Sequence, residues 1–137
     1  KKIAYVAEGA DRLGLDGFRA VSGRAEELGG EGGELREGFD TVVSRAVASL
    51  PALCELCLPL VRVGGSFIAM KGPSGREELA ASGSAIEKLG GAFSAEHETI
   101  IRLREEHLCH PLFVIEKCGH TPTQYPRQFS KIAKRPL

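Results

Sequence analysis

Apolar residues recur along this chain with two different periods, and the periods predict where helices and strands lie. Segments with apolar residues every three to four positions, ended by glycine or opened by proline, are typical of amphipathic helices. Short runs rich in β-branched and aromatic residues are typical of strands. The predicted helices cover residues 2–13, 51–61 and 76–89. The predicted strands cover residues 18–22, 39–44, 66–70, 93–103 and 112–117.

The order of these elements indicates an α/β fold. Strands separated by helices favour parallel pairing, because a parallel neighbour can only be reached by crossing one face of the sheet. The last two strands have no helix between them, so we expect an antiparallel pair at the edge of a mixed, doubly wound sheet. A flexible loop rich in glycine and glutamate is expected over residues 28–38.

In doubly wound sheets, ligands bind beyond the carboxyl ends of the parallel strands. Residues 23–26, 44–46 and 70–73 follow three predicted strands and are therefore expected at that edge. Arg45 and Lys71 would bring two cations there, which suggests an anionic substrate. The stretch from Ser22 to Glu27 has two interpretations. It is either the capped start of a helix or a site where backbone N–H groups and one carboxylate bind the base of a ligand.

Composition limits the class of protein. The 137 residues match one domain, and 42% hydrophobic with 26% charged residues is typical of a soluble globular chain. No apolar run has membrane-spanning length, and the first residues lack the features of a signal peptide, so a cytoplasmic location is the expectation. Lys+Arg and Asp+Glu both number 18, but residues 121–137 contain no acid. The basic residues of this tail are Arg127, Lys131, Lys134 and Arg135.

A metal site is the weaker interpretation of the cysteines and histidines. Cys54 and Cys57 have metal-ligand spacing, but they lie on an apolar helix where cysteine is usually a small core residue. His97 and His107 are expected on the surface. We therefore predict no metal. Further ligands could only come from Cys109, His110, Cys118 and His120.

Three segments carry a family resemblance. They are "SRAVASL", "GGSFIAMKG" and the terminal T-P-x-x-Y-P-R followed by K-x-P-L. With them the chain resembles, from Lys1 to Leu137, the later part of the ribosomal RNA small subunit methyltransferase G family. The resemblance implies a partial class I (Rossmann-like) methyltransferase fold and methylation of guanine N7 in the decoding region of 16S rRNA, with S-adenosylmethionine as cofactor. It also implies that Ala25 and Glu26 hold the adenosine portion and that Arg45 lines the cofactor and active-site pocket.

The chain departs from that family at its front. A class I fold begins with a strand, a glycine-rich turn and, after the next strand, an acidic residue for the ribose. None of these is present, since the glycines of residues 28–38 lie between other elements. We therefore expect residues 1–137 to be the C-terminal portion of a single methyltransferase domain that extends upstream by roughly 100 residues. Alone, this portion is expected to be inactive.

The basic tail is expected to meet RNA. Three prolines, at 122, 126 and 136, predict that residues 121–137 form no independent element. The tail would lie across the domain beside the cleft and, together with Lys71, bind phosphates of 16S rRNA or of the small ribosomal subunit. A solvated, disordered end is the alternative. The RNA-binding candidates are Lys71, Arg127, Lys131, Lys134 and Arg135.

The implied chemistry calls for no catalytic side chain. N7 of guanine has a lone pair and no proton to remove, so the rate must come from alignment of the reacting atoms. Two other functions remain open. One is a non-catalytic RNA-binding module of the same fold, and the other is a nicotinamide-dependent dehydrogenase, whose glycine-rich fingerprint is equally missing.

Overall fold

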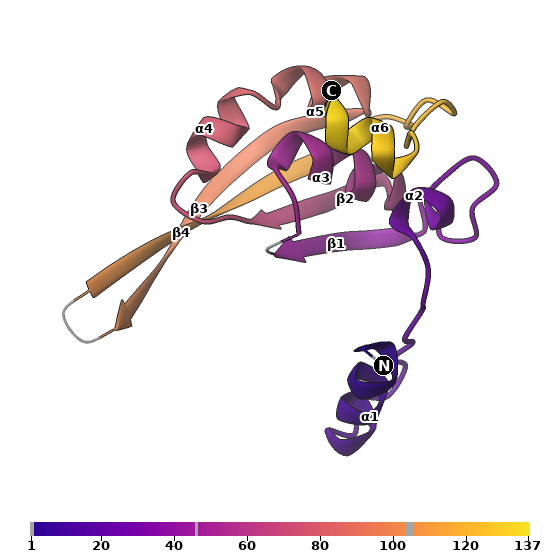
Figure 1. Ribbon diagram of the computed structural model, residues 1–137, viewed down its shortest axis with the longest axis vertical. Helices are drawn as coiled ribbons and strands as arrows, with labels where there is room; N and C mark the ends of the chain where they lie inside the picture. Colours follow the sequence, from indigo (N-terminus) through magenta and orange to yellow (C-terminus); the bar gives the residue numbers. More distant parts are fainter. Residues whose placement is uncertain (1, 46, 104–105) are drawn as a thin grey trace.

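The protein is built on a four-stranded mixed sheet (Figure 1). The computed structural model describes residues 2–45, 47–103 and 106–137. The strands run in the order β1-β2-β4-β3, with β1 parallel to β2 and β4 antiparallel to both of its neighbours. This confirms the α/β class and the antiparallel pair at the sheet edge. The strands are β1 (Phe39–Arg45), β2 (Val61–Met70), β3 (Gly91–Leu103) and β4 (Glu106–Lys117).

Strand β2 begins five residues before the predicted position because its glycines lie inside the strand. Phe39 pairs with Val61, and the register then shifts, so that Thr41 pairs with Ser66. Gly64 has a φ of 83°, which favours glycine, and a Cβ at Gly65 would lie 2.5 Å from the carbonyl oxygen of Asp40. The glycine pair therefore forms a bulge and does not mark the start of the strand.

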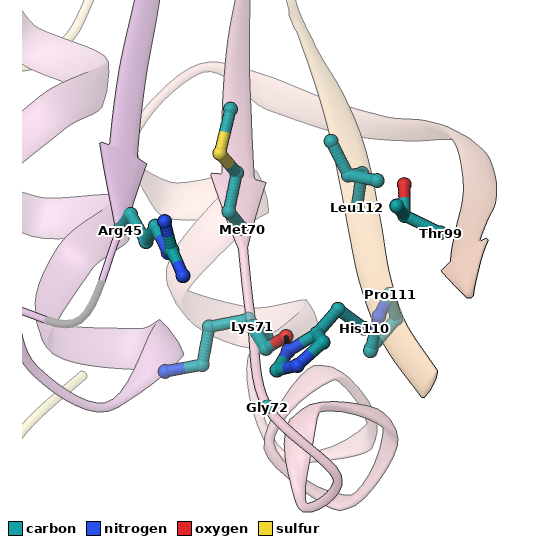
Figure 2. Close-up of a pocket in the computed structure, with 8 residues that line it drawn as sticks. All are labelled: Arg45, Met70, Lys71, Gly72, Thr99, His110, Pro111 and Leu112. Atoms are coloured by element: carbon teal, nitrogen blue, oxygen red, sulfur yellow. Dashed lines mark hydrogen bonds between the residues drawn. The ribbon is translucent and has the colours of Figure 1, made fainter. Parts of the chain in front are cut away.

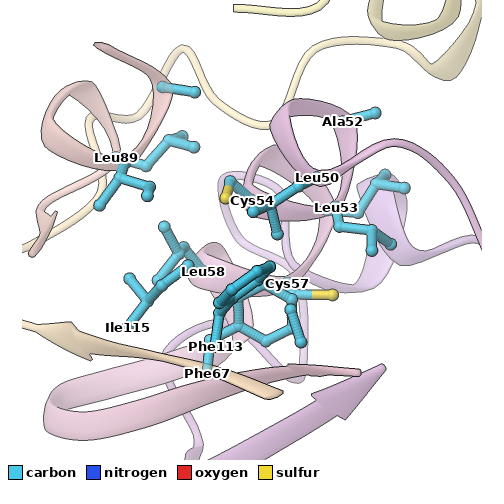
Figure 3. Packing of buried hydrophobic residues seen from close by; sticks show 14 of the residues in the cluster. Leu50, Ala52, Leu53, Cys54, Cys57, Leu58, Phe67, Leu89, Phe113 and Ile115 are labelled. Carbon is cyan, nitrogen blue, oxygen red and sulfur yellow. The ribbon is translucent and has the colours of Figure 1, made fainter. Parts of the chain in front are cut away.

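The crossover from β1 to β2 supplies the centre of the core. It consists of α3 (Leu50–Cys57) and a 3₁₀ turn (Leu58–Leu60), and every residue of α3 except Pro51 is buried. The helix packs on the face of the sheet that carries Phe67 and Phe113 (Figure 3). Cys54 and Cys57 lie in this core, as predicted. Burial raises the pKa of both thiols to about 12, so they stay protonated at neutral pH.

Two further predictions of local structure need correction. No strand forms over residues 18–22, because the segment does not pair with β1 and an unpaired strand leaves its backbone groups without partners. The predicted helix 76–89 is divided into α4 (Gly75–Ala80) and α5 (Gly83–Lys88). At the break, the buried Ser82 donates its hydroxyl proton to the carbonyl oxygen of Glu78 at 2.6 Å.

The N-terminal part of the described chain stands away from the sheet. The helix α1 (Lys2–Arg12) matches the prediction, and Ala10 is its one buried residue within the described part. A second short helix, α2 (Ala25–Leu28), follows after a long connection (Figure 1). None of the helices that the structure describes is long and apolar enough to cross a membrane.

The C-terminal tail contains a helix, so the prediction that it forms no element is wrong. Helix α6 (Phe129–Lys134) lies between Pro126 and Pro136, which flank it without interrupting it. Ile132 of α6 is fully buried in the core. Burial of the Ile132 side chain thus stabilises this short helix. The spacing of the prolines alone does not predict it.

A buried ion pair holds the segment just before α6. Glu55 of α3 is inaccessible to solvent and accepts hydrogen bonds from Arg127: from its backbone N–H at 2.9 Å, from Nε at 2.8 Å and from Nη2 at 2.6 Å. Because removal of one partner would leave a charge unpaired in the core, this contact constrains where the tail can lie.

A second cluster ties the tail to the loop before β1. Glu37 accepts hydrogen bonds from the buried Lys117 Nζ at 3.1 Å and from the backbone N–H of Thr121 at 2.9 Å, and one of its oxygens lies 2.6 Å from Nδ1 of His120. Burial alone would raise the pKa of Glu37, but these contacts outweigh it and lower the pKa to about 2. The carboxylate therefore stabilises the fold in its charged form.

The lowered pKa of Glu37 predicts how the free energy of unfolding changes as the pH falls. A carboxyl whose pKa falls from 4.5 to about 2 on folding contributes stability above pH 4.5, and this contribution is lost as the pH falls towards 2. Glu37→Gln should therefore lower the free energy of unfolding by up to about 3 kcal/mol at pH 7. Urea unfolding of both proteins between pH 7 and 2.5 should show this difference shrinking as the pH falls. The matched control is Glu8→Gln on exposed α1, and a difference independent of pH would contradict the assignment.

Candidate functional site

A hollow opens at the carboxyl end of the parallel strands β1 and β2 (Figure 2). Its volume is about 450 Å³, within the range of small-molecule sites. Most of its surface is apolar, with a few polar side chains at the mouth. The lining residues are Arg45, Met70, Lys71, Gly72, Thr99, His110, Pro111 and Leu112.

The strand register explains why these residues meet. Arg45 is the last residue of β1 and pairs with Met70, the last residue of β2. Met70 in turn pairs with Leu112 of β4, and His110 of β4 pairs with Thr99 of β3. Side chains from all four strands are thereby brought to one end of the sheet, the end at which α/β folds bind ligands.

Arg45 is the available cation of this hollow. Its side chain is exposed, and it points from the end of β1 into the open space beside β2 (Figure 2). Within the described part of the chain, no carboxylate or carbonyl oxygen binds its guanidinium group. An unpaired guanidinium at a hollow can bind a carboxylate or phosphate through two parallel hydrogen bonds.

Lys71 is engaged within the protein. Its side chain is only 10% exposed, and Nζ lies 2.8 Å from both the carbonyl oxygen of Ala48 and Oε2 of Glu78. Glu78 also accepts a hydrogen bond from the backbone N–H of Leu50 at 2.6 Å. Burial alone would raise the pKa of Glu78, but the bonds from Lys71 and Leu50 lower it overall. Lys71 thus joins β2, α4 and the segment that follows Arg45.

His110 also lines this hollow, although its sequence pattern indicated only a possible metal ligand. Its ring is half-buried, and Nδ1 lies 3.3 Å from the backbone carbonyl oxygen of Lys71. Its place opposite Thr99 follows from the β3–β4 pairing, and β4 begins six residues before the predicted strand 112–117, so no local signal placed His110 near the hollow. Among the described residues there is no group of three or more potential metal ligands, with or without this histidine.

A second hollow of about 470 Å³ lies between α2 and the tail. Glu26 lines it, and its carboxylate lies 2.8 Å from Nε of Arg24. Burial would raise the pKa of Glu26, but the bond from Arg24 and backbone N–H groups, including that of Phe129, lower it overall. The tail residues Pro126–Ser130 form the opposite wall.

The structure brings together only part of the predicted site. Arg45 and Lys71 meet in the first hollow, whereas Ala25 and Glu26 lie with α2 near the start of β1 (Figure 1). A Cβ added to Gly29, which ends α2, would touch Leu60, the residue before β2. The prediction that residues 23–26 share the carboxyl edge with 44–46 and 70–73 is thus wrong in this structure, since no strand over 18–22 carries them there. Ala46 lies outside the described residues.

The tail cations likewise have different surroundings. Arg127 forms the ion pair with Glu55, while Lys131, Lys134 and Arg135 are exposed. Among the described residues, no acidic side chain forms an ion pair with these three. The tail lines the second hollow and not the first.

Comparisons with known proteins agree on one family. A family model described as rRNA small subunit methyltransferase G matches residues 1–109. Proteins named Ribosomal RNA small subunit methyltransferase G are 44% identical in Clostridium tetani and 45% identical in Alkaliphilus metalliredigens over all 137 residues. The match covers 56% of each of these proteins, so the chain spans about half the length of the curated relatives it matches.

A solved structure supports the fold. The crystal structure of M. jannaschii TYW2 in complex with AdoMet aligns with a TM-score of 0.57 at 14% identity, covering 84% of this chain and 53% of that one. This likeness confirms the class I, Rossmann-like α/β architecture. Because the family model matches well over half of the sequence, the chain belongs to the ribosomal RNA small subunit methyltransferase G family.

Proposed function

We propose that the protein containing this chain transfers a methyl group from S-adenosylmethionine to N7 of a guanine in the decoding region of 16S rRNA. The observation that carries the proposal is the hollow at the carboxyl end of β1 and β2 in a chain of this family, with the guanidinium of Arg45, which has no partner among the described residues, at its mouth. The substrate would be 16S rRNA or the small ribosomal subunit, which places the protein in the cytoplasm. A non-catalytic RNA-binding module of the same fold is the alternative.

The first hollow fits a cofactor of this chemistry. S-adenosylmethionine supplies an activated methyl group and carries a carboxylate, for which Arg45 is a suitable partner. Met70 and Leu112 give the hollow apolar walls, and its volume of about 450 Å³ suits a small molecule. For the adenosine portion, Ala25 and Glu26 remain candidates on the family resemblance, although they lie beside the second hollow.

The residues of the hollow position the reactants and remove no proton. N7 of guanine attacks with its lone pair, so a general base has nothing to accept from it, and alignment supplies the rate. Lys71 and Glu78 contribute by holding Ala48 and Leu50, which follow Arg45 along the chain. We therefore propose that Lys71 contributes to RNA binding mainly by positioning Arg45, and less by contacting a phosphate itself.

The exposed cations of α6 and the residue after it are proposed to bind RNA phosphates. Lys131, Lys134 and Arg135 point to solvent beside the buried Ile132, which fixes the helix that carries them. Arg127 is proposed to hold this helix in place through Glu55 and to add its charge to the same surface. Each phosphate contact releases counterions, so binding through these residues should weaken with salt.

Loss of the Arg45 charge should weaken cofactor binding. The test protein is a fusion of this chain with the remaining segment of the Clostridium tetani relative, titrated with S-adenosylmethionine by calorimetry. Arg45→Met should raise Kd at least about 10-fold, because a charge-assisted hydrogen bond is removed. Arg62→Met, at the other end of the same sheet and paired with Asp40, is the control and should leave Kd unchanged. Equal Kd values for Arg45→Met and the unaltered fusion would contradict the assignment.

Neutral tail variants should respond less to salt. In the same fusion, Lys131→Gln with Lys134→Gln should reduce the slope of log K for 16S rRNA binding against log salt by about 0.7 to 0.9 for each phosphate that the variant no longer neutralises. Lys88→Gln, an exposed lysine of α5, is the matched control. Filter binding at several salt concentrations measures the slope. An unchanged slope in the double variant would remove the tail from the RNA-binding surface.

A further inference from the structure

The imidazole of His110 has a defined hydrogen-bonding pattern. Nδ1 lies 3.3 Å from the carbonyl oxygen of Lys71, and a carbonyl oxygen can only accept a hydrogen bond. We therefore assign the proton of the neutral ring to Nδ1. A neutral imidazole carries one N–H, so Nε2 is left as an acceptor at the hollow that His110 lines (Figure 2).

The carbonyl group of Lys71, which selects this tautomer, is restrained because both the backbone N–H and the side chain of Lys71 are bound. The backbone N–H of Lys71 donates to the carbonyl oxygen of Pro111 at 2.9 Å, next to His110 itself. The Lys71 side chain is fixed by Ala48 and Glu78. Because the acceptor of the Nδ1 proton cannot move freely, the acceptor character of Nε2 is built into the site before any ligand binds.

The polar groups of the hollow differ in what they can offer. Arg45 can only donate hydrogen bonds, whereas Nε2 of His110 accepts, and the Thr99 hydroxyl can do either. The walls between them are formed by Met70 and Leu112, which are apolar and suit the face of a flat ring. With Arg45 directed at the cofactor carboxylate, the hollow therefore offers Nε2 of His110 to a hydrogen-bond donor on the edge of a planar ligand.

Guanine, the target base of the proposed reaction, presents two adjacent donors on its Watson–Crick edge, N1–H and the 2-amino group. We propose that His110 is a specificity-determining residue whose Nε2 accepts a hydrogen bond from N1–H or the 2-amino group of the target guanine, while Arg45 holds the cofactor. This arrangement leaves N7 uncovered for attack. The inference rests on the proposed function and specifies how the same site selects its base.

Base analogues test the assignment. The ratio kcat/KM for methyl transfer by the fusion protein is measured on 16S rRNA fragments carrying guanine, inosine, which lacks the 2-amino group, or 1-deazaguanine, which lacks N1–H. The unaltered protein should prefer guanine at least about 10-fold over one of the analogues. His110→Phe should abolish that preference, and His110→Gln, whose amide can still donate to Lys71 and accept from the base, should restore part of it. His97→Phe, an exposed histidine of β3 outside the hollow, should keep it.

A preference for guanine that survives in His110→Phe would overturn the inference and leave the proposed function intact. Absence of methyl transfer by the unaltered fusion would overturn both. The tautomer can be checked on the chain itself by ¹⁵N NMR, with His110→Phe identifying the signal. Protonation at Nδ1 in the neutral ring is expected, and protonation at Nε2 would overturn the proposal independently of any activity.

Discussion

Parallel pairing of β1 with β2 determines how the other elements are arranged. Parallel neighbours need a crossover, and here the crossover is α3, which is buried on nearly all sides. Both ends of α3 then receive polar anchors. At its start, Glu78 and Lys71 bind Leu50 and the residues before it, and in its last turn Glu55 binds Arg127. One helix thereby positions both the segment after Arg45 and the C-terminal tail.

The same arrangement separates cations that look alike in the sequence. Lys71 and Arg127 are held by carboxylates, whereas no described partner holds Arg45, Lys131 or Lys134. A paired cation orients its surroundings, and an unpaired one is available to a ligand or to RNA. Whether a cation is paired depends on which carboxylate lies near it in space. Glu55 is 72 positions from Arg127 in the sequence, and Glu78 is 7 positions from Lys71.

Much of the sheet could be predicted from local pattern. The β-branched run of β1 and the absence of a helix between β3 and β4 were sufficient for the strand types and for the antiparallel edge. The strand expected at 18–22 and the tail helix were not, because the first depends on a pairing partner and the second on burial of Ile132. For the site, strand ends indicated Arg45 and Lys71, but the His110 contact with Lys71 joins residues 39 positions apart and leaves no local signal.

We propose that the protein containing this chain is an active guanine-N7 methyltransferase whose reaction takes place at the carboxyl end of β1 and β2. The most direct test incubates the fusion protein with small ribosomal subunits lacking the modification and S-adenosylmethionine, and then maps N7-methylguanine in 16S rRNA by reduction and strand scission. We expect cleavage at a single guanine in the decoding region, and weaker cleavage with Arg45→Met at limiting S-adenosylmethionine. Absence of cleavage, or a methyl group found on another atom or outside that region, would contradict it.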